Sequence, residues 1–220
     1  MARHAPTQIG EYMNPLASAT SQPRALLVLE DGTTFEGRCC GASGETFGEI
    51  VFNTSMTGYQ EIISDPSYAG QIVTLTYPQV GNYGIDPAVM QRDVLHLRGF
   101  VVHDMCYEPS NWTSKQSLPE FLQENGVVAI EGIDTRALTM HLRDHGAQKA
   151  AISTEDLDPA HLLTRVQASP SISEHNFVPD VSVEVPHVVP ATSKKRFNVV
   201  AYDCGEKNGI LQGLAANGCE

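Results

Sequence analysis

The stretch ALLVLEDGTTFEG, residues 25–37, decides how the fold begins. Apolar residues run from Ala25 to Leu29, the pair Asp31 and Gly32 follows, and threonine and phenylalanine come next. Asp-Gly between two short strand-like runs favours a tight turn in which glycine adopts a positive φ. The stretch therefore predicts a β-hairpin.

Further strands are predicted downstream of this hairpin. Residues 49–53 and 71–77 are rich in β-branched and aromatic side chains and are bounded by glycine or proline. Residues 127–130 form another short apolar run. These patterns predict that strands dominate the first half of the chain.

Helix signals appear after the strands. Ser117 and Glu120 have the three-residue spacing of a capping box, and Gly126 supplies a left-handed stop. Asp134 is placed to cap a second helix that ends at Gly146 and has Leu138, His141 and Leu142 on one face. Asp158-Pro159 opens a third helix that runs to about Val166, because proline is tolerated in the first helical position.

The chain divides into four segments. We expect a flexible extension over residues 1–24, a domain over 25–168, a proline-interrupted linker over 169–196, and a first β-α unit over 197–220. This last unit consists of a buried strand at 197–202, a turn at 203–205 and a helix closing at 217–218. One such step cannot bury both faces of its strand, so we expect more chain to follow it. The fold class is therefore α/β, with a strand-rich α+β first domain and the truncated start of a parallel α/β domain.

Composition excludes several classes of function. The formal net charge of -12 disfavours binding to nucleic acid or to an anionic membrane, and no run reaches the roughly 20 apolar residues of a membrane span. The five cysteines are odd in number and lack a Cys-x-x-Cys pair, so we expect reduced thiols in a cytoplasmic protein. The glycines at 41–44 lack the lysine of a phosphate-binding loop, so ATP is not expected on this chain.

One long string carries a family resemblance. Residues 48–62, GEIVFNTSMTGYQEI, are followed by DPSY at 65–68, TYP at 76–78 and GNYG at 81–84. Agreement continues at 132–139, GIDTRALT, and at Val200-Ala201-Tyr202-Asp203 with Gly205 and Lys207. This ordered set resembles the small, glutamine-hydrolysing subunit of carbamoyl-phosphate synthetase, from roughly Ala25 to Glu220.

The resemblance implies a function for the family as a whole. Such proteins join an amino-terminal domain to a flavodoxin-like class I glutamine amidotransferase domain, and they form a heterodimer with a large subunit. A cysteine thiolate, aided by histidine and glutamate, hydrolyses L-glutamine through a thioester. Ammonia then reaches the large subunit, where ATP with Mg and bicarbonate give carbamoyl phosphate for arginine or pyrimidine synthesis. We expect these three catalytic residues beyond position 220, so the 220 residues alone are predicted to be inactive and to hold no cofactor.

One substrate contact matches a position of this chain. The serine of the string holds glutamine in the family, which corresponds to Ser55, and a hydroxyl suits this role because it both donates and accepts. From the residues alone, Ser55 could instead cap the turn after its strand. The family also has a bulky residue and then Asn-Ile-Leu-Arg where this chain has Cys204, Gly209 and Gln212, so the first helix of the second domain is altered.

Two other interpretations compete. The chain could be a binding module for the large subunit without catalysis, or a small hydrolase with Cys204 as nucleophile ahead of a helix, although no base partner is identifiable. His141 and His145 have the four-residue spacing of a zinc pair. No third ligand is evident near them, so a structural role at the helix end is favoured and no metal is expected.

Overall fold

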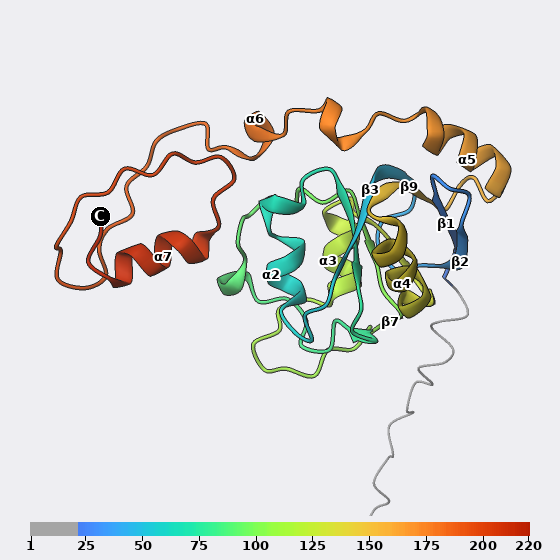
Figure 1. Cartoon of the computed structure of the whole chain (residues 1–220). Coiled ribbons are helices and arrows are strands. Elements are labelled where there is room, and N and C mark those ends of the chain that lie inside the picture. Colours follow the sequence, from blue (N-terminus) through green and yellow to red (C-terminus); the bar gives the residue numbers. More distant parts are fainter. Residues whose placement is uncertain (1–21) are drawn as a thin grey trace, which may run out of the picture.

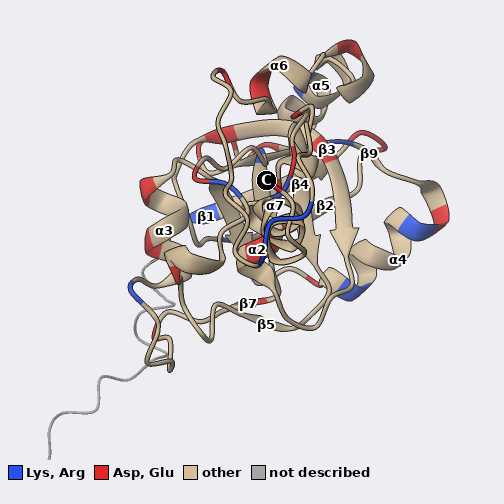
Figure 2. Ribbon diagram, turned by 90° about the vertical axis from the view of Figure 1, so that its left-hand side faces the viewer, with Lys and Arg blue, Asp and Glu red and all other residues tan. Residues whose placement is uncertain are grey.

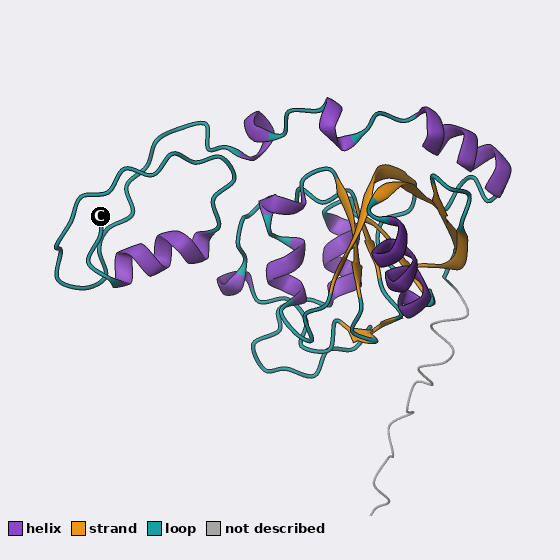
Figure 3. Cartoon of the chain, in the orientation of Figure 1, coloured by secondary structure: helices purple, strands orange, loops and turns teal. Residues whose placement is uncertain are grey.

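The computed structural model describes residues 22–220. The predicted extension at 1–24 therefore lies almost entirely outside the described residues. Within them, strands and helices are mixed and the first domain is rich in strands, which confirms the α/β class (Figure 3).

A closed seven-stranded barrel forms the centre of the first domain. Its strands follow each other around the barrel in the order β1-β2-β8-β6-β4-β3-β9, and β9 pairs with β1 to close the ring. The strands are β1 (Arg24–Leu29), β2 (Thr34–Cys39), β3 (Glu45–Asn53), β4 (Gln71–Leu75), β6 (Gly99–Val101), β8 (Val128–Glu131) and β9 (Gln148–Ser153).

The barrel has a parallel and an antiparallel part. Strands β3, β4, β6 and β8 run parallel to one another, whereas β1, β2 and β9 join them through antiparallel pairs. The β1–β2 pair is the hairpin that the sequence predicts, with Val28 opposite Thr34. A separate two-stranded parallel sheet pairs β5 (Gln79–Val80) with β7 (Asp104–Met105).

Helices cover the barrel on several sides (Figure 1). The larger helices are α2 (Tyr59–Ile63), α3 (Leu118–Glu124), α4 (Thr135–His145), α5 (Pro159–Ala168) and α7 (Asn208–Ala216). Short helical turns are η1 (Pro66–Tyr68), η2 (Pro87–Val89), η3 (Ile172–Glu174) and α6 (Val178–Val181). Within residues 22–220, every helix is too short or too polar to cross a lipid bilayer.

The predicted helix ends agree with the structure. Ser117 and Glu120 form the capping box of α3, Asp134 accepts a hydrogen bond at the start of α4, and Asp158 does so for α5. Each cap satisfies amide groups that have no partner inside the helix. The local sequence signals therefore set where these helices begin.

Three apolar clusters bury much of the barrel wall on both faces, whereas Thr34, Glu36 and Arg38 on the outer face of β2 are exposed. One apolar cluster joins alternate residues of the strands, such as Leu27 and Ile50, with Leu138 and Leu142 of α4. A second cluster packs the opposite faces of β4 and β6 against α2 and α3, and a third packs β1 and β9 against α5. Because side chains alternate along a strand, Leu27 and Leu26 enter different clusters.

The chain continues beyond α5 as a long segment that runs past the barrel and returns at α7 (Figure 1). The predicted buried strand at 197–202 is wrong for this chain. Val200 is 84% exposed and Tyr202 is 92% exposed. Within the described residues this stretch pairs only with residues 218–220, through the isolated bridge between Phe197 and Cys219 and a hydrogen bond from the Val199 amide to the Glu220 carbonyl at 2.8 Å. A strand needs neighbours along its length to satisfy its backbone groups, and among the described residues only the short stretch 218–220 pairs with it. The predicted helix end at Asn217 is confirmed.

Charge is distributed unevenly over the helices (Figure 2). Acidic side chains mark α3, whereas α4 carries residues of both signs. The net charge of -12 therefore does not arise from a single acidic segment.

Candidate functional site

The Ser55 loop, residues 54–58, connects β3 to α2. Asn53 shapes its first half, because its Oδ1 accepts a hydrogen bond from the Ser55 amide at 2.8 Å and its Nδ2 donates to the Tyr68 hydroxyl at 2.9 Å. Ser55 itself is exposed, and its hydroxyl has no partner among the residues that the structure describes. The turn is thus capped by Asn53, and the Ser55 hydroxyl stays available to a ligand.

Tyr83 holds the other end of the loop. Its hydroxyl accepts hydrogen bonds from the amides of Gly58 at 2.9 Å and Tyr59 at 3.0 Å. Its ring stacks on Tyr59 with 4.1 Å between the ring centroids, and the Tyr59 hydroxyl donates to the Gly84 carbonyl at 2.7 Å. Gly58 has φ of 85°, a conformation that favours glycine. The loop is therefore fixed on both sides of Ser55.

Two buried polar residues, Gln60 of α2 and Ser64 at its C-cap, hold a neighbouring loop. The Gln60 side chain accepts from the Asp86 amide at 2.9 Å and donates to the Asp86 carbonyl. The Ser64 hydroxyl donates to the Gln60 carbonyl at 2.8 Å and accepts from the Gln91 amide at 3.0 Å. Sequence reasoning did not assign these roles, although both polar residues stand within or directly after the long string. Buried polar side chains require such partners, so the string encodes a scaffold as well as a contact.

Two cavities flank the loop. One of about 220 Å³ is lined by Ser55 together with Thr57, Tyr77, Asn82 and Tyr83. The other, of about 450 Å³, lies between the string and the start of α7, and its lining includes Asn53, Glu61, Asp65 and Lys207. The Lys207 ammonium lies 2.9 Å from Asp65 Oδ2, so the second cavity joins residues far apart in sequence. Both cavities are wide enough for small polar molecules.

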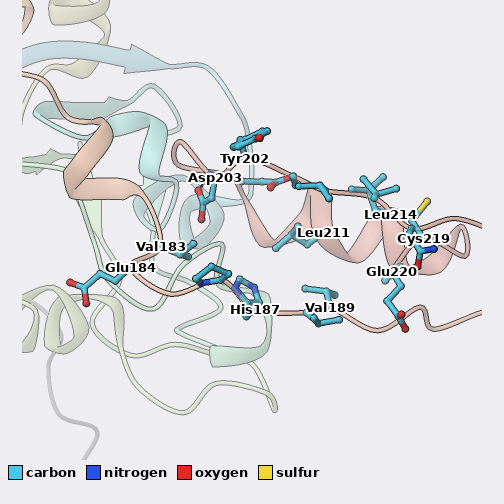
Figure 4. A pocket seen from close by; sticks show the side chains of 18 residues that line it. Val183, Glu184, His187, Val189, Tyr202, Asp203, Leu211, Leu214, Cys219 and Glu220 are labelled. Atoms are coloured by element: carbon cyan, nitrogen blue, oxygen red, sulfur yellow. Dashed lines mark hydrogen bonds between the residues drawn. The ribbon is translucent and has the colours of Figure 1, made fainter.

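A third cavity lies in the last segment of the chain. It has a volume of about 600 Å³ and is lined by valines of the linker and by Leu211 and Leu214 of α7 (Figure 4). The lining also includes Val200 and Tyr202, whose side chains are 84% and 92% exposed.

Cys204 is exposed and lies four residues before α7 begins at Asn208. Within the described part of the chain it has no hydrogen-bond or ion-pair partner. His175, one of the two linker histidines near enough in sequence to approach it, instead contacts Asp180 at 2.7 Å. Among the described residues no side chain is seen to contact the Cys204 thiol, so the geometry adds no support to a hydrolase built on it.

The histidine pair of α4 has structural partners. His141 Nε2 lies 2.5 Å from Asp31 Oδ2 of the β1–β2 turn, and His145 Nδ1 lies 3.0 Å from the His141 carbonyl oxygen. Burial raises the pKa of Asp31, but hydrogen bonds from Thr33, His141 and Gln148 outweigh it and lower this pKa to about 2. The pair joins α4 to the hairpin, and residues 22–220 bring no third metal ligand to it.

Comparison with known proteins identifies the family. Residues 27–152 match the family model described as the carbamoyl-phosphate synthase small chain, CPSase domain. The carbamoyl phosphate synthase small chains of Syntrophotalea carbinolica, Nitratidesulfovibrio vulgaris and Thermotoga maritima are 47%, 48% and 49% identical to this chain. These alignments cover 90%, 89% and 90% of this chain, but 56%, 56% and 50% of the relatives.

The aligned region extends past the first domain. The alignment with the first relative covers 209 residues, whereas the family model matches only residues 27–152 of this chain. The similarity therefore includes residues outside 27–152. The chain spans about half the length of the curated relatives it matches. On this similarity, the chain belongs to the carbamoyl-phosphate synthase small chain family.

Proposed function

We propose that the protein is the glutamine-hydrolysing subunit of a carbamoyl-phosphate synthetase, and that Ser55 contacts the bound glutamine. Hydrolysis releases glutamate and ammonia, and ammonia passes to a large subunit that uses bicarbonate, ATP and Mg. The nucleophilic cysteine, its histidine and the glutamate come from residues after position 220. The greater length of the relatives supports this division.

The observation that carries the proposal is the state of the Ser55 hydroxyl. It is exposed beside a cavity of about 220 Å³ and unpaired among the described residues, while both ends of its loop are held by Asn53 and Tyr83. A rigid loop with a free hydroxyl loses little entropy when the hydroxyl binds a ligand. An amino-acid head group offers both a donor and an acceptor to such a hydroxyl.

The test uses the full-length protein purified together with its large subunit. Glutamate release and carbamoyl phosphate formation are measured for the wild type, for Ser55→Ala and for Ser43→Ala. Loss of one hydrogen bond is expected to raise the KM for glutamine about 2- to 12-fold in Ser55→Ala. Ser43 is also exposed but lies in the loop between β2 and β3, so Ser43→Ala serves as the matched control.

Two results would contradict the proposal. A wild-type complex that forms carbamoyl phosphate from free ammonia but releases no glutamate from glutamine would show that the subunit is not a glutaminase. Equal KM values for Ser55→Ala and Ser43→Ala would remove Ser55 from the glutamine site. Binding of the 220-residue chain to the large subunit without glutamate release is expected, because the proposed nucleophile lies outside it.

A further inference from the structure

Arg92 connects the first domain to the turn that precedes α7. Its Nη2 donates to Asp203 Oδ1 at 2.7 Å and to Oδ2 at 2.6 Å, and its Nε donates to the Glu206 carbonyl at 2.7 Å. The Arg92 and Asp203 side chains are only 18% and 13% exposed. The Arg92 guanidinium therefore binds residues at both ends of the turn, Asp203 and Glu206.

Asp203 also builds the turn that Arg92 grips. Its Oδ1 accepts hydrogen bonds from the amides of Gly205 and Glu206, both at 2.8 Å. Gly205 has φ of 98°, and a Cβ at this position would lie 2.9 Å from Val181 of α6. Burial raises the pKa of Asp203, but the bonds from Arg92 and from the two amides outweigh it and lower this pKa to about 2. Asp203 is thus charged at neutral pH, and its position decides the shape of the turn.

A second set of contacts holds the same turn from its other end. Lys207 reaches Asp65, which also caps η1 by accepting from the Ser67 amide at 2.9 Å. The amide of Asn208 donates to the Gln91 carbonyl, and the amide of Gly209 donates to Gln91 Oε1, both at 3.2 Å. Gln91 is the neighbour of Arg92, so one short segment of the first domain contacts residues 203–209 at several points.

These contacts also place the 203–207 turn close to the Ser55 loop. Lys207 and Asn53 line the same cavity of about 450 Å³. The Asn53 side chain accepts the hydrogen bond from the Ser55 amide. A shift of the turn would therefore change the geometry between the start of the second unit and the Ser55 loop. Figure 4 shows Asp203 at the end of the last segment that faces the first domain.

We propose that Arg92 is a positioning residue, which acts through Asp203 to fix the 203–207 turn on the first domain and thereby places the second unit against the Ser55 loop. The kinetic consequence of this proposal rests on the proposed glutaminase function. A partly buried charged pair that also shapes a backbone turn differs from an exposed pair such as Arg24 and Glu36, whose side chains are 69% and 70% exposed. Removal of the Arg92 side chain should therefore weaken the contact between the first domain and the 203–207 turn, whereas removal of the Arg24 side chain should leave this contact unchanged.

The kinetic test uses the full-length protein with its large subunit. Arg92→Ala, Asp203→Asn and the double variant are compared with the wild type and with the control Arg24→Ala. Asn at 203 retains an oxygen that can accept the two turn amides and loses only the charge, so it separates docking from turn formation. We expect Arg92→Ala to raise the KM for glutamine about fivefold or more with a smaller change in kcat, and the double variant to match it, because coupled residues are not additive. Arg24→Ala should stay within about twofold.

The second readout does not depend on activity. Amide hydrogen exchange at Asn208 and Gly209, whose N–H groups donate to Gln91 across the contact, should be about tenfold faster or more in Arg92→Ala. Arg92→Lys keeps the charge but cannot span Asp203 and Glu206 together, so it should give an intermediate rate.

The outcomes separate this inference from the proposed function. Unchanged exchange at Asn208 and Gly209 in Arg92→Ala overturns the positioning role, as do additive effects of Arg92→Ala and Asp203→Asn on KM. A wild-type protein without glutaminase activity would refute the proposed function alone, and the exchange comparison would still decide whether Arg92 holds the turn.

Discussion

Replacement of Tyr83 by phenylalanine should loosen the Ser55 loop without removing any ring contact. The substitution keeps the stacking on Tyr59 but removes the hydroxyl that accepts from the amides of Gly58 and Tyr59. An amide left without a partner in a buried site costs about 1–3 kcal/mol. Tyr83 is half-buried, so water can reach part of the site, and we expect a total loss of about 1–2 kcal/mol in the free energy of unfolding.

The measurement is equilibrium urea unfolding followed by far-UV circular dichroism, supported by thermal unfolding. For a chain of this size, each 1 kcal/mol corresponds to a fall in Tm of about 2–4 °C, so a shift of roughly 2–8 °C is expected. Amide exchange at Gly58 and Tyr59 should also become faster.

Tyr77→Phe is the matched control for this substitution. Tyr77 is 42% exposed and its hydroxyl has no hydrogen-bond partner within the described residues. Removal of that hydroxyl should change stability by less than about 0.5 kcal/mol. Equal effects of Tyr83→Phe and Tyr77→Phe would refute the reasoning, because they would show that the two amides gain nothing from the Tyr83 hydroxyl.

Two further predictions concern stability. Leu138 is fully buried where α4 packs on the barrel strands, so Leu138→Ala should lower the free energy of unfolding by about 2–5 kcal/mol. Met140 lies on the same helix but is 44% exposed, so Met140→Ala should change this free energy by less than about 0.5 kcal/mol. Both values are measured by urea unfolding. Burial raises the pKa of both Asp31 and Asp203, but hydrogen bonds to their carboxylates outweigh it and lower each pKa to about 2, below the ordinary value of 3.8 for aspartate. Their ionised forms therefore stabilise the fold fully above about pH 4, and this contribution is lost as the pH falls toward 2. In an acid titration of the Tm, Asp31→Asn should flatten the fall between these pH values, and an unchanged slope would contradict the assignment.

Local signals in the sequence predicted the elements whose determinants lie within a few residues. Asp31 and Gly32 gave the hairpin turn, and Ser117 with Glu120 gave the start of α3. Strand β9 was not predicted, although it closes the barrel by pairing with both β1 and β3. Its residues Ala150, Ala151 and Ile152 are all buried, so the alternation that marks a strand with one solvated face is missing.

The candidate site was only partly predictable for a related reason. Ser55 was found through the family resemblance, and its role as a glutamine contact stays a prediction. The partners that hold its loop could not be found by local pattern, because Tyr83 lies 25 residues from Gly58 and meets it only when the chain folds. The strand predicted at 197–202 was wrong because an apolar run specifies a strand only where neighbouring strands pair with it.

The sequence by itself determined the family, the mixed class of the fold and the ends of the main helices. These properties follow from long ordered strings and from caps and turns that act over three or four residues. The tertiary structure alone decided which distant groups meet: the closure of the barrel by β9, the hold of Tyr83 on the Ser55 loop, and the contact of Arg92 with Asp203 across 111 positions of sequence. Such contacts depend on how the whole chain buries its apolar faces, and no short window of sequence contains that information.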